Sequence, residues 1–190
     1  MTTRFTVLFD ACVLYSAPLR DMVLNLAMAN VFHARWTDEI HEEWTGNLLA
    51  NRPDLTLSQV QRTRELMNKS VPDCLVTGYQ GLIPSLSLPD PDDRHVLAAA
   101  IHANAATIVT QNLKDFPMES LRLYHMEVQH PDDFFVCQFD LNPVAFCTAI
   151  KRQRSNLKKP PVSVEDYLGI LSGLGMVQSV ELLKKYSHLI

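Results

Sequence analysis

The sequence predicts an α/β fold with a mostly parallel central sheet, followed by a helical extension. Short apolar runs alternate with segments of helical periodicity over the first 140 residues, and no strand pattern remains after them. The chain has 190 residues, of which 47% are hydrophobic and 20% charged, enough for one domain with an appendage. We therefore expect a domain at residues 1–140 and an α-helical extension at residues 141–190.

The first strand is expected at residues 5–9, which are aromatic or β-branched for the most part and are followed at once by Asp10. Helical spacing of apolar residues then predicts three helices: residues 19–34, a helix capped by Thr37, and a helix capped by Thr56 or Ser58 that ends near Lys69. Residues 74–77 are a candidate short strand.

The pair Asp90-Pro91 fits a helix start, and an Ala-rich helix is expected from there to about residue 103. Residues 107–110 form the next expected strand, followed by a loop to residue 117. A further strand is expected at 127–129, before a helix that opens at Pro131. Three more helical patterns follow: residues 142–157, 163–173 and 176–187.

Charge is divided unevenly along the chain. Residues 1–150 hold 10 Lys or Arg and 18 Asp or Glu, a net charge of −8, whereas residues 151–190 hold 7 and 3, a net charge of +4. The basic residues of the extension have two interpretations, a solvated helix face or a patch that contacts RNA phosphates. They are Lys151, Arg152, Arg154, Lys158 and Lys159.

Several protein classes are excluded by composition. The four cysteines are far apart and form no CxxC pair, so we expect neither disulfides nor a zinc site. No apolar run approaches about 18 residues, so no membrane span is expected. The first segment, MTTRFTVLFD, lacks the layout of a signal peptide, and we expect a cytoplasmic protein.

Carboxylates recur where expected strands end or helices begin. Because functional groups collect at the carboxyl ends of parallel strands, these side chains are candidates for one site. Crowded oxygen ligands favour Mg²⁺ or Mn²⁺, which can activate water for phosphodiester hydrolysis. The candidates are Asp10, Glu42, Glu43, Asp90, Asp92, Asp93, Asn112 and Asp115.

Each candidate also has a structural explanation. Acids in the first turn of a helix are stabilised by the helix dipole by roughly 0.3–1 kcal/mol, and Asn or Asp is common in turns. Glu42 and Glu43 are adjacent on a helix, so only one of them can face a site. Among the histidines, His95 and His102 are expected on the surface or in packing, and His41 is a weak candidate for phosphate contact.

Three segments resemble PIN-domain nucleases: LFDACVLYS, TDEIHEEWTGNL and LPDPDDRHVLAAAIHANAATIVTQNLKDFP. The resemblance covers residues 5–135 and implies a three-layer α/β/α sandwich that cuts RNA with one or two Mg²⁺ or Mn²⁺ ions. It implies that Asp10, Glu43, Asp93 and Asp115 are the catalytic metal ligands. Asn112 stands where many relatives have an acid, and Asp90 and Thr110 have supporting roles.

Within that family the chain resembles VapC-like toxins of toxin–antitoxin pairs. This implies a metal-dependent endoribonuclease held inactive by a cognate antitoxin, and homodimers are common among such proteins. Two alternatives remain: a PIN-like protein that only binds RNA or a partner, and a haloacid-dehalogenase-like phosphatase. The phosphatase needs a second acid two residues after the first, where this chain has Cys12.

Overall fold

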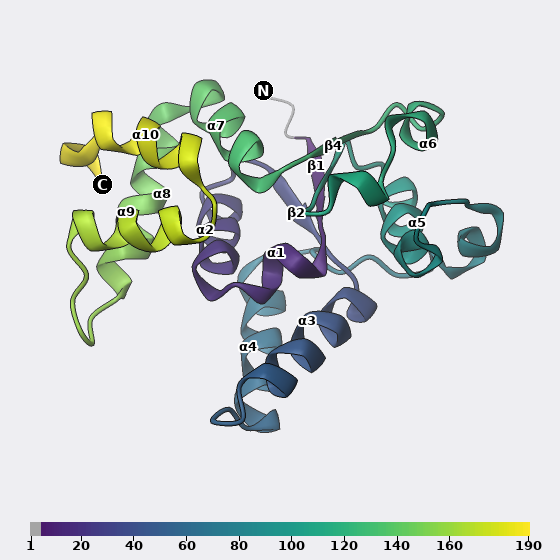
Figure 1. Ribbon diagram of the computed structural model, residues 1–190, viewed down its shortest axis with the longest axis horizontal. Coiled ribbons are helices and arrows are strands. Elements are labelled where there is room, and N and C mark those ends of the chain that lie inside the picture. The colour runs from purple at the N-terminus through teal and green to yellow at the C-terminus, as the bar shows by residue number, and fades with distance from the viewer. Residues whose placement is uncertain (1–4) are drawn as a thin grey trace.

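The computed structural model describes residues 5–190, and a four-stranded sheet lies at its centre (Figure 1). Residues 1–4 lie outside the described residues. They open the segment MTTRFTVLFD, for which no signal peptide is expected. The strands are β1 (Thr6–Phe9), β2 (His33–Arg35), β3 (Thr107–Val109) and β4 (Glu127–Gln129). All pairs are parallel, in the order β2-β1-β3-β4, which confirms the predicted parallel sheet.

Helices cover both faces of this sheet, as a sandwich requires. Between β1 and β3 the chain forms α1 (Ala11–Tyr15), α2 (Ala17–Met28), α3 (Asp38–Asn51), α4 (Leu57–Ser70), the 3₁₀ turns η1 (Gln80–Ser85) and η2 (Pro91–Asp93), and α5 (Arg94–His102). The turn η3 (Leu113–Asp115) and α6 (Met118–Arg122) follow β3. Figure 1 shows α2 and α5 on opposite sides of the strands. The fold is the predicted α/β/α sandwich.

The C-terminal part is helical, as predicted. It consists of α7 (Pro131–Leu141), α8 (Pro143–Asn156), α9 (Val164–Gly173), α10 (Val177–Lys185) and the turn η4 (Ser187–Leu189). Helix α8 packs along α2, and Gln153 Nε2 donates a hydrogen bond of 2.9 Å to the carbonyl of Pro18. The division at residues 140 and 141 falls where α7 meets α8, and it stays a prediction.

Two local predictions are wrong. The helix expected at 19–34 ends at Met28, because Asn30 adopts φ 60° and turns the chain into β2. Strand β2 has only three residues, which is too short for an alternation of apolar and polar side chains to stand out beside a longer helical pattern. Residues 74–77 form no strand, and contribute only one bridge, between Leu75 and Trp36.

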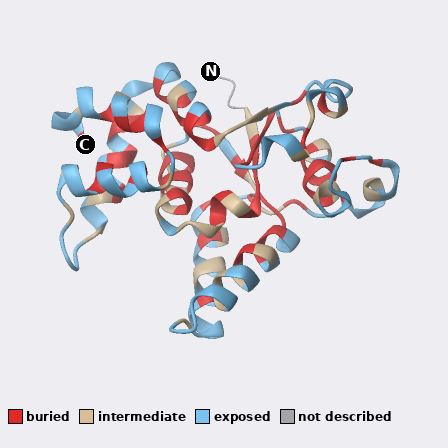
Figure 2. Ribbon diagram, viewed as in Figure 1, coloured by how far each residue is buried: buried red, intermediate tan, exposed pale blue. Residues whose placement is uncertain are grey.

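The core lies between the sheet and the helices, where Figure 2 shows the inner faces buried. Phe134 of α7 joins the C-terminal helices to the sheet, because its ring centroid lies 5.7 Å from that of Phe9 and 5.2 Å from that of Phe32. Beyond the carboxyl end of β2, Trp36 Nε1 and His41 Nε2 both contact Asn68 Oδ1, at 2.8 and 2.9 Å. These contacts fix α3 and α4 on the sheet.

No helix within residues 5–190 has the length and apolar character that spanning a bilayer requires.

Asp132 connects two helices of the C-terminal part. Its carboxylate is buried and accepts hydrogen bonds from the backbone N–H groups of Gln178, at 2.7 Å, and Ser179, at 2.8 Å. These groups belong to the first turn of α10, which has no side-chain cap of its own. A carboxylate of α7 therefore satisfies the free N–H groups of α10 and holds the two helices together.

We expect Asp132→Ala to lower the free energy of unfolding by about 2 kcal/mol, because it leaves two backbone donors without partners. Urea denaturation followed by circular dichroism measures the loss. Asp140→Ala, at an exposed position of the same helix, is the matched control and should change stability little. Equal losses in the two variants would contradict the capping role.

Candidate active site

Asp10 lies where β1 ends and α1 begins, and three donors hold its carboxylate. Oδ1 accepts the backbone N–H of Ala11 at 2.6 Å, and Oδ2 accepts the hydroxyl of Thr110 at 2.7 Å and the thiol of Cys12 at 3.1 Å. Thr110 follows β3, the parallel neighbour of β1, so both residues emerge at the same edge of the sheet. The side chain is 5% exposed, and its orientation is fixed.

The loop after β3 is tied to the same group of residues. The backbone N–H of Gln111 donates to Cys12 Sγ at 3.2 Å, and that of Asn112 donates to the hydroxyl of Thr110 at 3.1 Å. Both loop residues thereby sit beside Asp10.

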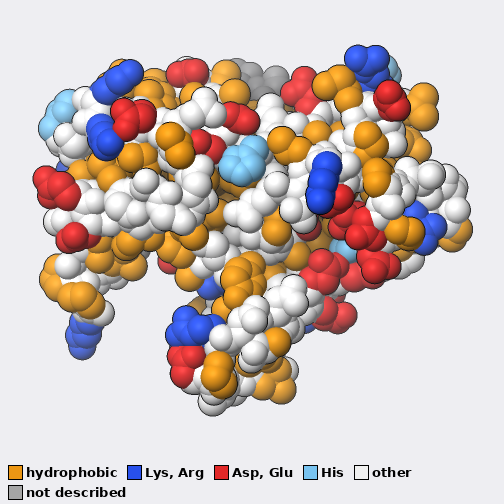
Figure 3. Space-filling model, in the orientation of Figure 1, with side chains coloured by type: hydrophobic (Ala, Val, Ile, Leu, Met, Phe, Trp, Pro, Cys, Tyr) orange, Lys and Arg blue, Asp and Glu red, His pale blue; other side chains and the backbone are white. Residues whose placement is uncertain are grey.

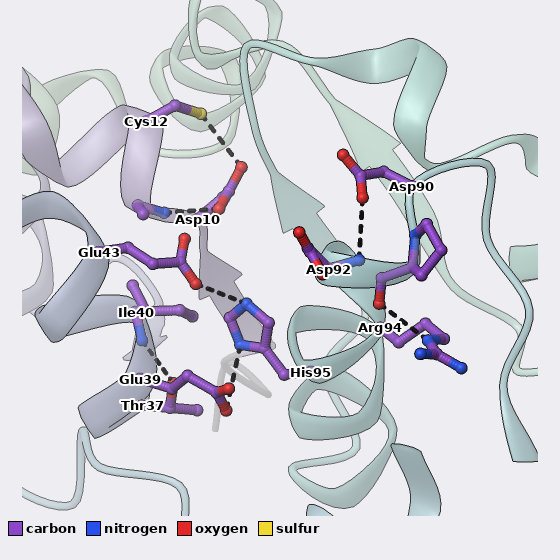
Figure 4. A network of polar contacts seen from close by, with 12 residues as sticks. Asp10, Cys12, Thr37, Glu39, Ile40, Glu43, Asp90, Asp92, Arg94 and His95 are labelled. Atoms are coloured by element: carbon purple, nitrogen blue, oxygen red, sulfur yellow. Dashed lines mark hydrogen bonds and ion pairs between the residues drawn. The ribbon is translucent and has the colours of Figure 1, made fainter. Parts of the chain in front are cut away.

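Glu43 reaches the site from α3 and is paired with a histidine of α5. Its Oε1 lies 2.6 Å from Nε2 of His95, which is 5% exposed (Figure 4). The other ring nitrogen is 3.6 Å from Oε2 of Glu39, which accepts a hydrogen bond from the hydroxyl of Tyr79. Burial works against the charged imidazole, but the bond to Glu43 and the nearby carboxylates raise the pKa of His95.

Asp93 directly precedes α5 and faces the other acids across a cavity of about 380 Å³. Burial raises the pKa of Asp93 to about 6, and the charges of Asp10, Asp115, Asp90 and Glu43 add to this effect in that order. The cavity is lined by Asp10, Ala11, Cys12, Tyr15, Glu43, Asn47, Asn51, Asp93, Gln111 and Asn112. Figure 3 shows acidic side chains gathered where α3 approaches the start of α5.

The predicted residues occupy different places in this arrangement. Asp10, Glu43, Asp93 and Asn112 line the cavity, whereas Asp115 lies outside its lining but close enough to act on Asp93. Asp90 is exposed, and its carboxylate caps η2 by accepting the N–H of Asp92 at 2.9 Å. Glu42 is exposed and does not line the cavity. The catalytic and metal-binding roles stay predictions.

The donor chemistry of the cavity fits a hard divalent cation. Carboxylate oxygens and an amide are the ligands that Mg²⁺ and Mn²⁺ prefer, and burial and then the charges of the neighbouring acids, both of which a bound cation would offset, raise the pKa of Asp93. Within residues 5–190, no three His, Cys, Asp or Glu side chains are close enough together to hold an ion among them. Mg²⁺ is commonly bound by one or two carboxylates and keeps several waters, so the fit rests on the oxygen donors of the cavity.

Three residues differ from their sequence-based interpretation. His95 belongs to the site through Glu43, and the available signal was its position two residues after Asp93. Cys12 holds Asp10, which the strand-end pattern did not indicate. His41 is fully buried, bonded to Asn68 and to Trp44 Nε1, so the suggested phosphate contact is wrong.

The basic residues of the extension fall into two groups. Lys151, Arg152, Lys158 and Lys159 are exposed. The guanidinium of Arg154 is directed inward and donates to the carbonyls of Val162, at 2.9 Å, and Ile190, at 3.3 Å. RNA contact by any of them stays a prediction.

The fold is a parallel α/β/α sandwich, and its carboxylates gather where β1 and β3 end. These two features are typical of PIN-like α/β proteins. The family model described as "PIN domain" matches residues 6–114, more than half of the chain, and the chain belongs to this family. A second model, described as "VapC50 C-terminal domain", matches residues 131–185.

One relative is the protein named "Putative ribonuclease VapC50" of Mycobacterium tuberculosis (strain ATCC 25618 / H37Rv). The two chains are 39% identical over 106 residues, which is 54% of this chain and 62% of the relative. The match thus spans less than two thirds of the relative's length. No solved structure matches the chain significantly.

We expect Asp93→Asn to raise the free energy of unfolding by about 1 kcal/mol in EDTA at pH 8, because it removes one charge from a group of like charges. Saturating Mg²⁺ should then stabilise the parent chain more than the variant. Thermal and urea unfolding measure both effects. Asp92→Asn, at the exposed neighbouring position, should respond to Mg²⁺ as the parent does. Equal stabilisation of the parent chain and of Asp93→Asn by Mg²⁺ would contradict cation binding at Asp93.

Proposed function

We propose that this protein is a Mg²⁺- or Mn²⁺-dependent endoribonuclease, a hydrolase that acts as the toxin of a toxin–antitoxin pair. The observation that carries the proposal is the meeting of Asp10, Glu43 and Asp93 around one cavity, with Asp115 within electrostatic reach. Membership of the PIN domain family and the similarity to a protein named as a ribonuclease support it.

In this proposal Asp10, Glu43, Asp93 and Asp115 hold the cation, with Asn112 as a neutral ligand. When bound, the cation supplies Lewis-acid stabilisation of the phosphodiester and a more acidic water for in-line attack. Thr110 and Cys12 keep Asp10 in one orientation by donating to the same oxygen.

His95 has a positioning role in the proposed mechanism. By bonding to Oε1 of Glu43, it fixes the rotamer of that side chain and leaves Oε2 for the cavity. The nearby carboxylates raise the pKa of His95, and the protonated imidazole that this favours offsets part of their repulsion.

Asp10→Asn and Glu43→Gln should each lower RNA cleavage by at least about 100-fold, because each removes a charged ligand. Glu42→Gln is the matched control, since the neighbouring carboxylate is exposed and outside the cavity. RNA ends are sequenced after expression of each chain, and growth is recorded in the same cultures. The parent chain should generate new ends and arrest growth, whereas Asp10→Asn should do neither.

Cleavage should also disappear in EDTA and return with Mg²⁺ or Mn²⁺. New ends that persist in Asp10→Asn would sink the nuclease assignment. RNA binding without cleavage by the parent chain would favour the alternative, a PIN-like protein that only binds RNA or a partner.

The proposed partners are an RNA substrate and a cognate antitoxin. An Arg or Lys of the antitoxin that reached Asp10 and Asp93 would occupy the place of the cation and block activity. The similarity to VapC50 supports this partner. We further propose a cytoplasmic location and a homodimer.

The exposed lysines of the loop before α9 are proposed to contact RNA phosphates. Changing Lys158 and Lys159 together to Gln should weaken RNA binding and reduce the slope of log affinity against log salt by about 0.7 for each phosphate that is no longer bound. Fluorescence anisotropy over a range of salt concentrations measures both. Lys184→Gln, which removes a lysine paired with Glu181, is the control. An unchanged slope in the double variant would contradict the patch.

A further inference from the structure

A second cavity, of about 600 Å³, adjoins the acidic one. Cys12, Tyr15 and Gln111 line both cavities, so the two are direct neighbours. The second cavity lies between the α1–α2 junction and the α3–α4 pair, and Leu174, after α9, closes one side. Figure 3 shows the molecule hollowed between the α3–α4 pair and the C-terminal helices.

A buried arginine that forms no ion-pair contact in the described part of the chain lies in the wall of this second cavity, although the charge of the neighbouring Asp21 acts on it from farther away. Arg20 is 7% exposed, and no carboxylate within residues 5–190 lies within 4.0 Å of its guanidinium. Its guanidinium carbon is 4.7 Å from the ring centroid of Trp44, and one terminal nitrogen donates to the carbonyl of Leu14 at 2.7 Å. The Nε–H has no partner.

Such an arrangement is costly unless a ligand uses it. A charged group removed from water is expected to be paired, and a buried donor left unsatisfied costs about 1–3 kcal/mol. The hydroxyl of Ser16, another lining residue, is also buried without a partner. A buried cation in the wall of a cavity beside the proposed cleavage site favours an anionic occupant.

The remaining walls suit an aromatic base. Leu48, Leu55, Val60 and Leu174 supply apolar surface, and Tyr15 lines both this cavity and the acidic one. The volume falls in the range of about 300–1,000 Å³ that is typical of small-molecule sites. Bases stack on aromatic and apolar side chains whatever their sequence.

We propose that this cavity, named here the Arg20 pocket, holds an unpaired nucleotide adjacent to the scissile phosphate, with its base on the apolar wall and its phosphate facing Arg20. The proposal rests on the proposed nuclease function and specifies single-stranded RNA as the substrate. An RNA strand presents anions at regular spacing, so one phosphate meets the acidic cavity with its cation and the next meets Arg20. A peptide ligand would instead need a cationic side chain at the acidic cavity and an anionic side chain at Arg20.

Binding is measured by fluorescence anisotropy with labelled oligouridylate and oligoadenylate, using the full chain carrying Asp10→Asn so that cleavage does not consume the probe. Adding Arg20→Gln should weaken binding about tenfold and reduce the salt slope by about 0.7, the value for one phosphate contact. Arg20→Lys should keep the slope. Arg62→Gln, at an exposed position outside the pocket, should change neither quantity.

Arg20 also bonds to the carbonyls at the end of α1, so changing it could lower RNA binding by destabilising the fold. A second variant tests the pocket without changing Arg20. Thr63 lies on α4, is partly exposed and lines the pocket. Thr63→Trp therefore places a large side chain in the pocket and leaves Arg20 unchanged. In an otherwise unchanged chain it should raise KM for RNA cleavage about tenfold with kcat unaltered, since the base no longer packs on the apolar wall. A lower melting temperature for Arg20→Gln with an unchanged salt slope, together with an unaltered KM for Thr63→Trp, would overturn the proposal.

The outcomes separate the pocket from the nuclease assignment. Cleavage that is equally efficient in the parent chain and both variants would refute the pocket and leave the nuclease intact. RNA binding that depends on Arg20 in a chain that never cleaves would keep the pocket and refute the nuclease. If Arg20→Gln abolished co-purification of a protein partner while RNA binding was intact, the pocket would belong to that partner and the RNA proposal would be wrong.

Discussion

The parallel pairing of β1 with β3 is the constraint on which the candidate site depends. Pairing Phe9 with Val109 makes both strands end together, so that Asp10 and Thr110 emerge side by side from segments 100 residues apart. The hydroxyl of Thr110 then fixes Asp10 and accepts the N–H of Asn112. A different strand order would separate the first acid from the loop that supports it.

The acids that meet at this edge oppose folding in the absence of a cation. Burial and four neighbouring carboxylates disfavour the ionised form of Asp93, whereas the buried His95 contacts Glu43 and Glu39. The surrounding core supplies the stability that holds these charges together, through contacts such as Phe134 on Phe9 and Asn68 on Trp36. This stored repulsion is what a bound divalent cation would release.

The sheet and the acids could be predicted from sequence because both leave local patterns. Asp10 follows a buried strand directly, and Asp93 stands at the start of an Ala-rich helix. Strand β2 was missed because three residues after a turn at Asn30 carry no periodicity of their own. The partnership of His95 with Glu43 depends on how α3 and α5 pack, which spacing along the chain does not encode.

Helix α1 links the two cavities and explains why their charges differ in sign. Five residues are too few for a stable isolated helix, so its ends must be held from outside. Asp10 caps the first N–H, and Arg20 bonds to the carbonyls of Leu14 and Tyr15 at the other end. An acid at the positive end and a base at the negative end both follow from the helix dipole. The net charge of −4 is therefore a poor guide to the charge around any one cavity, because a single short helix has an acid at one end and a base at the other.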